Sequence, residues 1–259
     1  MTEAEWLACA DPTQMLGAVC NQPDERKIRL FALAGCRRIE PLLTAHEKNS
    51  RTAITVLERR IEAATSESDL RSALFAMLGE MHGHARNPGD AAGYTLFAAT
   101  GALYWVGKEN WKRLTESVSE AMAYDALARS GSRDLERIDA LCAQMGFDSV
   151  RWPREEDAVR LLPEYVDTLK VEQSNQANLL RDIFGNPFRP VAFSPSWRTD
   201  TAVAIARQMY ESRDFSAMPI LADAIQDAGC DSEDMLTHCR GDGPHVRGCW
   251  VVDLVLGKE

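Results

Sequence analysis

Cysteine and histidine side chains are concentrated near the end of the sequence. Cys230, His238, Cys239, His245 and Cys249 lie within 20 residues, although the whole chain has only seven cysteines and five histidines. Thiolate and imidazole are zinc ligand types, and one helical turn or a tight loop can close the spacing His245-x3-Cys249. We therefore take these five residues as candidate metal ligands, with zinc as the possible cofactor.

Two other interpretations of the same cluster remain open. In the first, Cys230 and Cys249 are core residues, His238 caps a helix C-terminus and His245 binds a loop carbonyl. It is favoured by the lack of a C-x-x-C pair, and because the adjacent His238 and Cys239 would point to different sides of a helix. In the second, a cysteine and a histidine form a nucleophile pair, supported by a carboxylate such as Asp253. Neither an oxyanion-hole loop nor a residue placed to orient the histidine is recognisable for it in the sequence.

Glu80-x-His82-x-His84 is a second possible metal cluster. Alternate residues converge in an extended segment and not on a helix, so this cluster requires a loop. A solvated loop is the alternative. The chain has no phosphate-binding glycine loop, dinucleotide fingerprint, H-E-x-x-H or EF-hand pattern, so the common enzyme classes have no support in the sequence.

Arginine and tryptophan side chains near the same end are candidates for binding a partner, because these residue types dominate the hot spots of protein interfaces. The alternative for the tryptophans is a place in the core between helices. The candidates are Arg189, Trp197, Arg240, Arg247 and Trp250.

Helical patterns dominate the elements that must position these residues. Thr2-x-x-Glu5 is a capping box, and apolar residues between 26 and 43 recur at helical spacing. A long helical segment is expected over 153–184, starting at Pro153. Only 188–197 and 250–256 have the composition of a short strand. We predict an all-α fold, an irregular multi-helix bundle with a small C-terminal helical module and at most a minor β-hairpin.

A loop rich in proline follows residue 184 and suggests a domain boundary. Gly185 is placed to end the preceding helix, and two nearby prolines keep the chain extended. We expect a helical body over 1–184 and a C-terminal module over 185–259 packed on it, or else a single domain over 1–259. Residues 250–256 are too apolar for a free end and should dock against the helices, with Gly248 turning the chain inward.

Charge and hydropathy limit the partners and the compartment. Lys and Arg number 29 and Asp and Glu 39, a net charge of −10, which opposes general binding to nucleic acid. The sequence contains no stretch of 18 uninterrupted apolar residues, so we predict no membrane span. The first residues include acids at positions where a signal peptide needs basic residues. An odd number of scattered cysteines is typical of reduced thiols. We expect a cytoplasmic protein with no membrane or nucleic-acid partner.

Several segments resemble a group of uncharacterised paralogous proteins that planctomycete bacteria encode in large numbers. The resemblance covers about the first 40 and the last 80 residues. It is carried by MTEAEWL at 1–7, RKIRLFA at 26–32 with CRR at 36–38, LLRDIFGNPFRP at 179–190, LADA at 221–224, and HCR at 238–240 through HVRGCWVVDL at 245–254. The resemblance implies a bacterial cytoplasmic protein and brings no activity with it.

Two functions follow as hypotheses. The first is a protein–protein interaction or adaptor module without catalytic activity, docking through the C-terminal part. The alternative is a metal-binding protein or a Cys–His hydrolase with its site within 230–249. A pocket joining Cys239, His245 and a carboxylate would favour the alternative.

Overall fold

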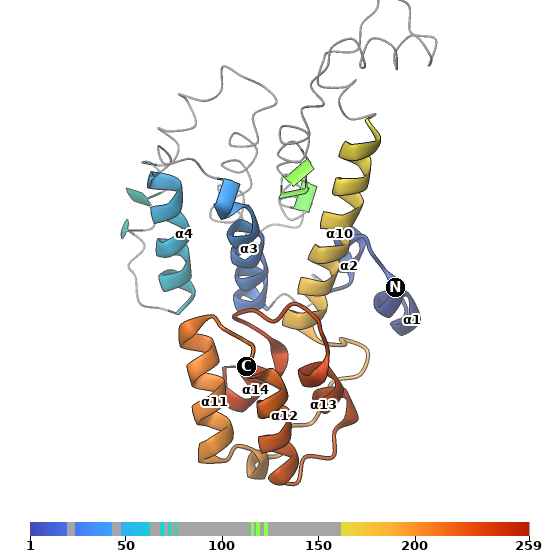
Figure 1. Ribbon diagram of the computed structural model, residues 1–259, viewed down its shortest axis with the longest axis vertical. Helices are drawn as coiled ribbons and strands as arrows, with labels where there is room; N and C mark the ends of the chain where they lie inside the picture. The colour runs from blue at the N-terminus through green and yellow to red at the C-terminus, as the bar shows by residue number, and fades with distance from the viewer. Residues whose placement is uncertain are drawn as a thin grey trace, which may run out of the picture. The chain divides into compact units, whose positions relative to one another are not determined.

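The structure is a computed structural model that describes residues 1–19, 24–42, 48–62 and 162–258, with the short stretches 68–69, 72–73, 76, 115–116, 118–119 and 122–123. Within these residues all regular structure is helical and no strand forms (Figure 1). The predicted all-α fold is confirmed. The Glu80–His84 cluster and the helix start at Pro153 lie outside the described residues; the described helix begins at Pro163.

The described part of the chain contains nine α-helices and two short 3-10 helices. Their bounds are α1 (Glu3–Ala8), α2 (Pro12–Val19), α3 (Glu25–Ile39), η1 (Glu40–Leu42), α4 (Lys48–Ile61), α10 (Pro163–Phe184), η2 (Pro195–Trp197), α11 (Asp200–Ser212), α12 (Met218–Asp227), α13 (Glu233–Arg240) and α14 (Trp250–Leu256).

The chain divides into two compact units. The first combines Met1–Ala34 with Asn175–Glu259, and the second is Gly35–Ser174. This grouping differs from the expected division at residue 184, because the first 34 residues belong with the C-terminal segment. The expected helical body over 1–184 with a module over 185–259 packed on it, or else a single domain, stays a prediction.

Helix α1 joins the first unit through the end of α10. The capping box predicted from Thr2 and Glu5 is present at its start. Trp6 is completely buried, and its indole N–H donates to the carbonyl of Gly185 over 3.2 Å. The Arg181 guanidinium donates to the carbonyls of Trp6 and Cys9. These bonds tie the N-terminal helix to the last turn of α10, next to the segment that carries the site.

Helices α11 to α14 pack around the core of the first unit (Figure 1). Residues 250–256 dock as expected, but they form helix α14 and no strand. Val251, Val252 and Val255 are completely buried at helical spacing, and Gly257 ends the helix in a left-handed conformation. Burial of this valine face outweighs the strand preference of β-branched residues, which is small and depends on context.

Arginines of α3 pair with buried carboxylates in the second unit. Arg38 binds Glu172 through two hydrogen bonds of 2.8 and 2.6 Å, and Arg37 binds both Glu40 and Glu58 at 2.7 Å. Glu58 and Glu172 are almost completely buried. Arg37 and Arg38 are therefore paired with carboxylates within the second unit.

Replacing Gly248 with alanine should lower the free energy of unfolding by about 2–4 kcal/mol, because two penalties add. Gly248 has a φ of +96°, and a Cβ there would lie 2.8 Å from Cδ1 of buried Leu30. Urea unfolding followed by far-ultraviolet circular dichroism measures the change. Gly243→Ala is the matched control, because its Cβ would meet open space; it should cost less than about 0.5 kcal/mol. Equal stability of the two variants would contradict the prediction.

Candidate functional site

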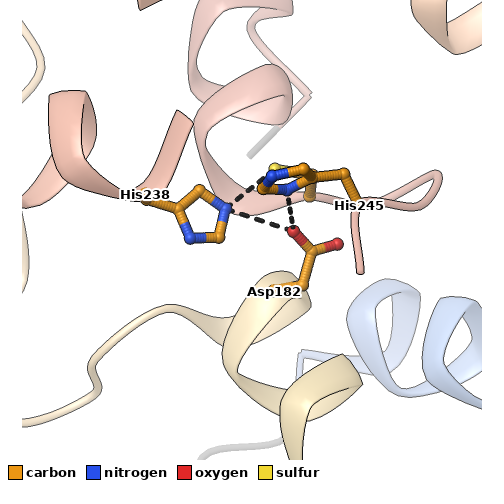
Figure 2. A group of neighbouring side chains, drawn as sticks. Asp182, His238 and His245 are labelled. Atoms are coloured by element: carbon orange, nitrogen blue, oxygen red, sulfur yellow. Dashed lines mark hydrogen bonds and ion pairs between the residues drawn. The ribbon is translucent and has the colours of Figure 1, made fainter. Parts of the chain in front are cut away.

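Three segments of the first unit bring four chemically reactive side chains together. Asp182 lies in the last turn of α10, His238 lies near the end of α13, and His245 lies in the loop that follows. Figure 2 shows the carboxylate of Asp182 pointing from α10 toward both imidazole rings. Cys249, the residue before α14, completes the group. We call Asp182, His238, His245 and Cys249 the four-residue cluster.

Asp182 is the centre of the hydrogen bonding in this cluster. Its Oδ1 lies 3.1 Å from His238 Nε2 and 2.9 Å from His245 Nδ1 (Figure 2). Its Oδ2 accepts the backbone N–H of Val246 at 3.0 Å. The carboxylate is only 2% exposed. One buried carboxylate thus fixes the positions of both histidines and of the loop between α13 and α14.

The ligand-type atoms of the cluster are close enough to share one ion. His238 Nε2 lies 3.3 Å from Cys249 Sγ in addition to its contact with Asp182. One ligand atom from each of the four residues lies within 4.8 Å of every other. Four atoms at such separations can surround a single small cation.

Packing restricts the two imidazole rings. The His238 ring meets the His245 ring edge to face, with centroids 4.9 Å apart, and lies 5.3 Å from the Trp250 ring. His245 is half-buried, and its buried Nε2 atom has no hydrogen-bond partner among the described residues. A buried polar atom without a partner is costly and rare. One ring nitrogen of the cluster therefore lacks a hydrogen-bond partner among the described residues.

Burial and charge move the pKa values of the two acidic members in opposite directions. For Asp182, burial acts to raise the pKa, but the hydrogen bonds from His238 and His245 outweigh it and the pKa is lowered. For Cys249, burial is the main influence and the charge of Asp182 the next, and together they raise its pKa well above the usual value. Cys249 is a neutral thiol in this environment and needs a cation to become a thiolate.

The five predicted metal ligands separate into two groups. His238, His245 and Cys249 lie together, whereas Cys230 and Cys239 are buried in the apolar core of the unit. Burial raises the pKa of the Cys239 thiol to about 12. His238 and Cys239 point to different sides of α13, as the sequence predicted.

Asp182, the fourth member in place of the core cysteines, was not among the residues predicted from the sequence. Its signal was its place in an apolar helical face: Leu179, Leu180 and Ile183 are buried around it on α10. An aspartate on such a face needs a buried partner. This requirement could have identified Asp182 as a partner for the two histidines, which need a hydrogen-bond acceptor.

Asp253, the carboxylate considered for a hydrolase, lies outside the cluster. It accepts two hydrogen bonds from the Arg26 guanidinium, to which Tyr210 is also bound. The pocket that would join Cys239 and His245 with this carboxylate is not formed by the described residues, because Cys239 packs in the core.

The candidate binding arginines all make contacts within the first unit. Arg189 binds Glu3 at 2.8 Å and Arg240 binds Asp223 at 2.8 Å. Arg247 donates to the carbonyl of Tyr210 and lies over its ring. These side chains connect elements within the unit, so the presence of arginines here is weaker evidence for a surface that binds a partner.

The two candidate tryptophans are half-buried. Trp197 packs edge to face on Phe193, with ring centroids 5.6 Å apart. Trp250 lies against Gly185, where a Cβ would come 3.2 Å from its Cγ, and it also contacts His238. Gly185 has a φ of +67° and follows the last residue of α10, as its position in the sequence predicted. Trp250 therefore connects the four-residue cluster to the end of α10.

Comparison with known proteins adds no relative: no protein-family model, curated protein or solved structure matches this chain significantly. Among the described helices, none is long and apolar enough to cross a membrane. The functional argument therefore rests on the four-residue cluster itself.

Proposed function

We propose that this chain is a zinc-binding protein in which Asp182, His238, His245 and Cys249 hold one Zn²⁺ ion. The observation that carries the proposal is the convergence of four ligand-type atoms, all within 4.8 Å of one another, from three separate segments. The buried Nε2 atom of half-buried His245 gives further support, because it has no hydrogen-bond partner among the described residues.

Zinc fits this donor set better than other common ions. Imidazole nitrogen, thiolate and carboxylate are its usual ligands, whereas Mg²⁺ and Ca²⁺ prefer oxygen alone. The thiolate of Cys249 and the carboxylate of Asp182 together balance the charge of a divalent cation. A neutral ion–ligand group is the form that a buried site tolerates. Zinc also lowers the pKa of a coordinating thiol enough to deprotonate it, which overcomes the effect of burial on Cys249.

The proposed role of the ion is structural. A tetrahedral zinc with four protein ligands has no open position for water or substrate, and such closed sites contribute directly to folding. Here the ion would join α10, α13 and the residue before α14. It would add to the hydrogen bonds by which Asp182 already holds the loop before α14.

The geometry gives less support to a Cys–His hydrolase. In a nucleophile–base–carboxylate arrangement, the histidine uses one ring nitrogen for the nucleophile and the other for the carboxylate. Here Nε2 of His238 faces both Cys249 and Asp182. Cys249 is also completely buried, and its raised pKa opposes formation of the nucleophilic thiolate.

We further infer that the protein works in the cytoplasm and binds a protein partner. Zinc binding requires Cys249 as a reduced thiol, and reduced thiols persist in the cytoplasm. The described cysteines are all free. For a partner, the supporting observation is the exposure of two large apolar side chains of the C-terminal segment, Phe188 and Ile220. The resemblance to the planctomycete family agrees with this compartment.

Two cysteine variants test the zinc site. The purified reduced protein should bind one equivalent of Zn²⁺, and Co²⁺ in its place should give a thiolate-to-cobalt charge-transfer band with the intense visible bands of tetrahedral cobalt. Cys249→Ala should abolish the charge-transfer band and weaken zinc binding at least tenfold, because it removes the only thiolate ligand. Metal analysis and cobalt titration by absorption spectroscopy measure both effects.

Cys239→Ala is the matched control. Cys239 is also completely buried with a raised pKa, but it lies in the core and not in the cluster. This variant should keep the stoichiometry and the cobalt spectrum of the parent protein. A parent protein that binds neither ion, or a cobalt spectrum that survives Cys249→Ala, would overturn the zinc proposal.

A further inference from the structure

A pocket of about 210 Å³ opens in the first unit next to the proposed zinc site. None of the four cluster residues lines it, but Trp250 does, and Trp250 also contacts His238. The neighbouring wall comes from the segment after α10, including Gly185 and Asn186. The pocket is therefore a separate feature that shares one aromatic wall with the cluster.

The walls of the pocket combine flat apolar surface with a few polar groups. Phe184, Val191, Trp250 and Leu254 supply apolar area, and prolines of the 185–190 loop add to it. Ligand sites generally have such a composition, with a few polar groups that orient the ligand. The volume is below the usual range for drug-sized ligands, so it suits a molecule with a single ring.

Positive charges outnumber negative charges at the end of the pocket near α14. Asp253 is the carboxylate at this end, it is almost completely buried, and both of its oxygens accept hydrogen bonds from Arg26. Lys27 lines the pocket as a second cation near the same carboxylate. Among the described residues, the Lys27 side chain has no hydrogen bond or ion pair. Arg26, Lys27 and Lys258 all act on this one carboxylate, and Arg26 binds it directly, which leaves the charge of Lys27 for a ligand.

The other charged residues of the lining, Arg189 and Asp234, lie together with Glu3 and form a group of one cation and two carboxylates. Arg189 binds Glu3 at 2.8 Å and approaches Asp234 at 3.5 Å. Arg189 and Asp234 are exposed and Glu3 is partly exposed, so water and salt screen the effect of these charges. The half-buried end with Lys27 consequently determines which ligand charge is favoured.

We propose that this pocket binds a small carboxylate that carries a flat apolar group, with the carboxylate at Lys27 and the ring against Trp250. A free aromatic acid and the C-terminal carboxylate of a peptide ending in an aromatic residue share this chemistry. The inference does not rest on the zinc proposal, since it uses no residue of the four-residue cluster.

Isothermal titration of the full-length protein with three single-ring probes tests the inference. Benzoate should bind with a dissociation constant on the order of 1 mM, a value suited to a ligand of this size. Benzamide, its neutral analogue, should bind at least tenfold more weakly, and benzylamine should bind more weakly still. The titrations are repeated with and without a metal chelator, so that loss of zinc is not mistaken for loss of the pocket.

Lys27→Met keeps the aliphatic stem and removes the charge, and it should reduce benzoate binding to the level of benzamide. Arg207→Met is the matched control: it removes an exposed cation of α11 that is outside the pocket, and it should leave benzoate binding unchanged. Unchanged melting temperatures establish that both variants fold. Equal binding of benzoate and benzamide, or benzoate binding that survives Lys27→Met, would overturn the proposal.

The source of the carboxylate is decided by a second pair of probes. N-acetylphenylalanine has the carboxylate of a chain end, and its amide lacks the charge. If the acid binds at least tenfold more tightly than benzoate and the amide does not, a peptide C-terminus is the supported source. If benzoate binds as tightly as the acid, a free aromatic acid is supported.

Discussion

Asp182→Ala is expected to lower the free energy of unfolding by about 3–5 kcal/mol, measured in urea with a metal chelator present. The substitution removes one buried carboxylate and leaves three groups without their acceptor: His238, His245 and the backbone N–H of Val246. Each buried group that loses its partner costs about 1–3 kcal/mol, although water entering the space recovers a part. Because domains are commonly stable by only about 5–15 kcal/mol, this loss is severe.

The same variant separates the hydrogen bonds of Asp182 from its proposed role as a ligand. With excess zinc at about 1,000 times its dissociation constant, the parent protein should gain about 4 kcal/mol, whereas Asp182→Ala should gain much less. The difference between parent and variant should therefore be larger in zinc than in the chelator. An equal difference in both conditions would mean that Asp182 acts through hydrogen bonds alone.

Asp167→Ala is the control for a general effect on the helix. Asp167 lies on the same helix, α10, but is exposed. Exposed substitutions away from special contacts usually change stability by less than about 0.5 kcal/mol. If Asp167→Ala and Asp182→Ala were equally destabilising, the contribution of Asp182 would come from helix propensity and not from the cluster.

Local patterns in the sequence predicted the helical fold of the described residues, because a helix depends on residues close to each other in the chain. The capping box of Thr2 and Glu5 and the end of α10 at Gly185 are of this kind. The composition of residues 250–256 gave the wrong element. Its valines favour a strand locally, but their burial against α11 and α13 decides for a helix, and no local pattern contains that information.

The candidate site shows the same limit more clearly. His238, His245 and Cys249 were predicted together because they are neighbours in sequence, and Cys230 and Cys239 were included for the same reason. Asp182 is 56 residues before His238 and was not chosen. Tertiary packing determines which side of α13 faces the core. It also determines that the end of α10 lies next to α13. The spacing of residue types narrowed the ligands to a segment but could not select among them.

Arg26→Met is expected to lower the free energy of unfolding by about 3–5 kcal/mol at neutral pH, the usual cost of breaking a buried ion pair from one side. Arg26 binds both oxygens of Asp253, the Tyr210 hydroxyl and the carbonyl of Lys258. It therefore connects α3 with α11 and α14. Methionine fills a similar volume without charge, so it leaves Asp253 as an uncompensated buried carboxylate. Urea unfolding of parent and variant measures the loss.

Arg240→Met provides the comparison at the surface. Arg240 binds Asp223 at 2.8 Å, but the Asp223 side chain is 70% exposed. Such exposed pairs contribute about 0–1 kcal/mol, since water solvates the remaining partner. Similar losses for the two variants would show that Asp253 finds another partner or enough water when Arg26 is removed.

The pH dependence of the Arg26→Met loss tests its cause. Burial is the largest influence on Asp253 and raises its pKa even though Arg26 acts to lower it. Without Arg26, the pKa of Asp253 in the folded protein should rise further. A carboxyl with a raised folded-state pKa binds protons more tightly in the folded than in the unfolded chain, so its penalty is complete above the folded-state pKa and disappears below the unfolded value. The loss caused by Arg26→Met should therefore be largest near neutral pH and shrink as the pH falls through the raised pKa.

In an Asp253→Asn background the same substitution should cost less and lose this pH dependence, because no charge remains to be neutralised. A loss that is constant with pH, or unchanged by Asp253→Asn, would mean that Arg26 acts through its packing and its bonds to Tyr210 and Lys258.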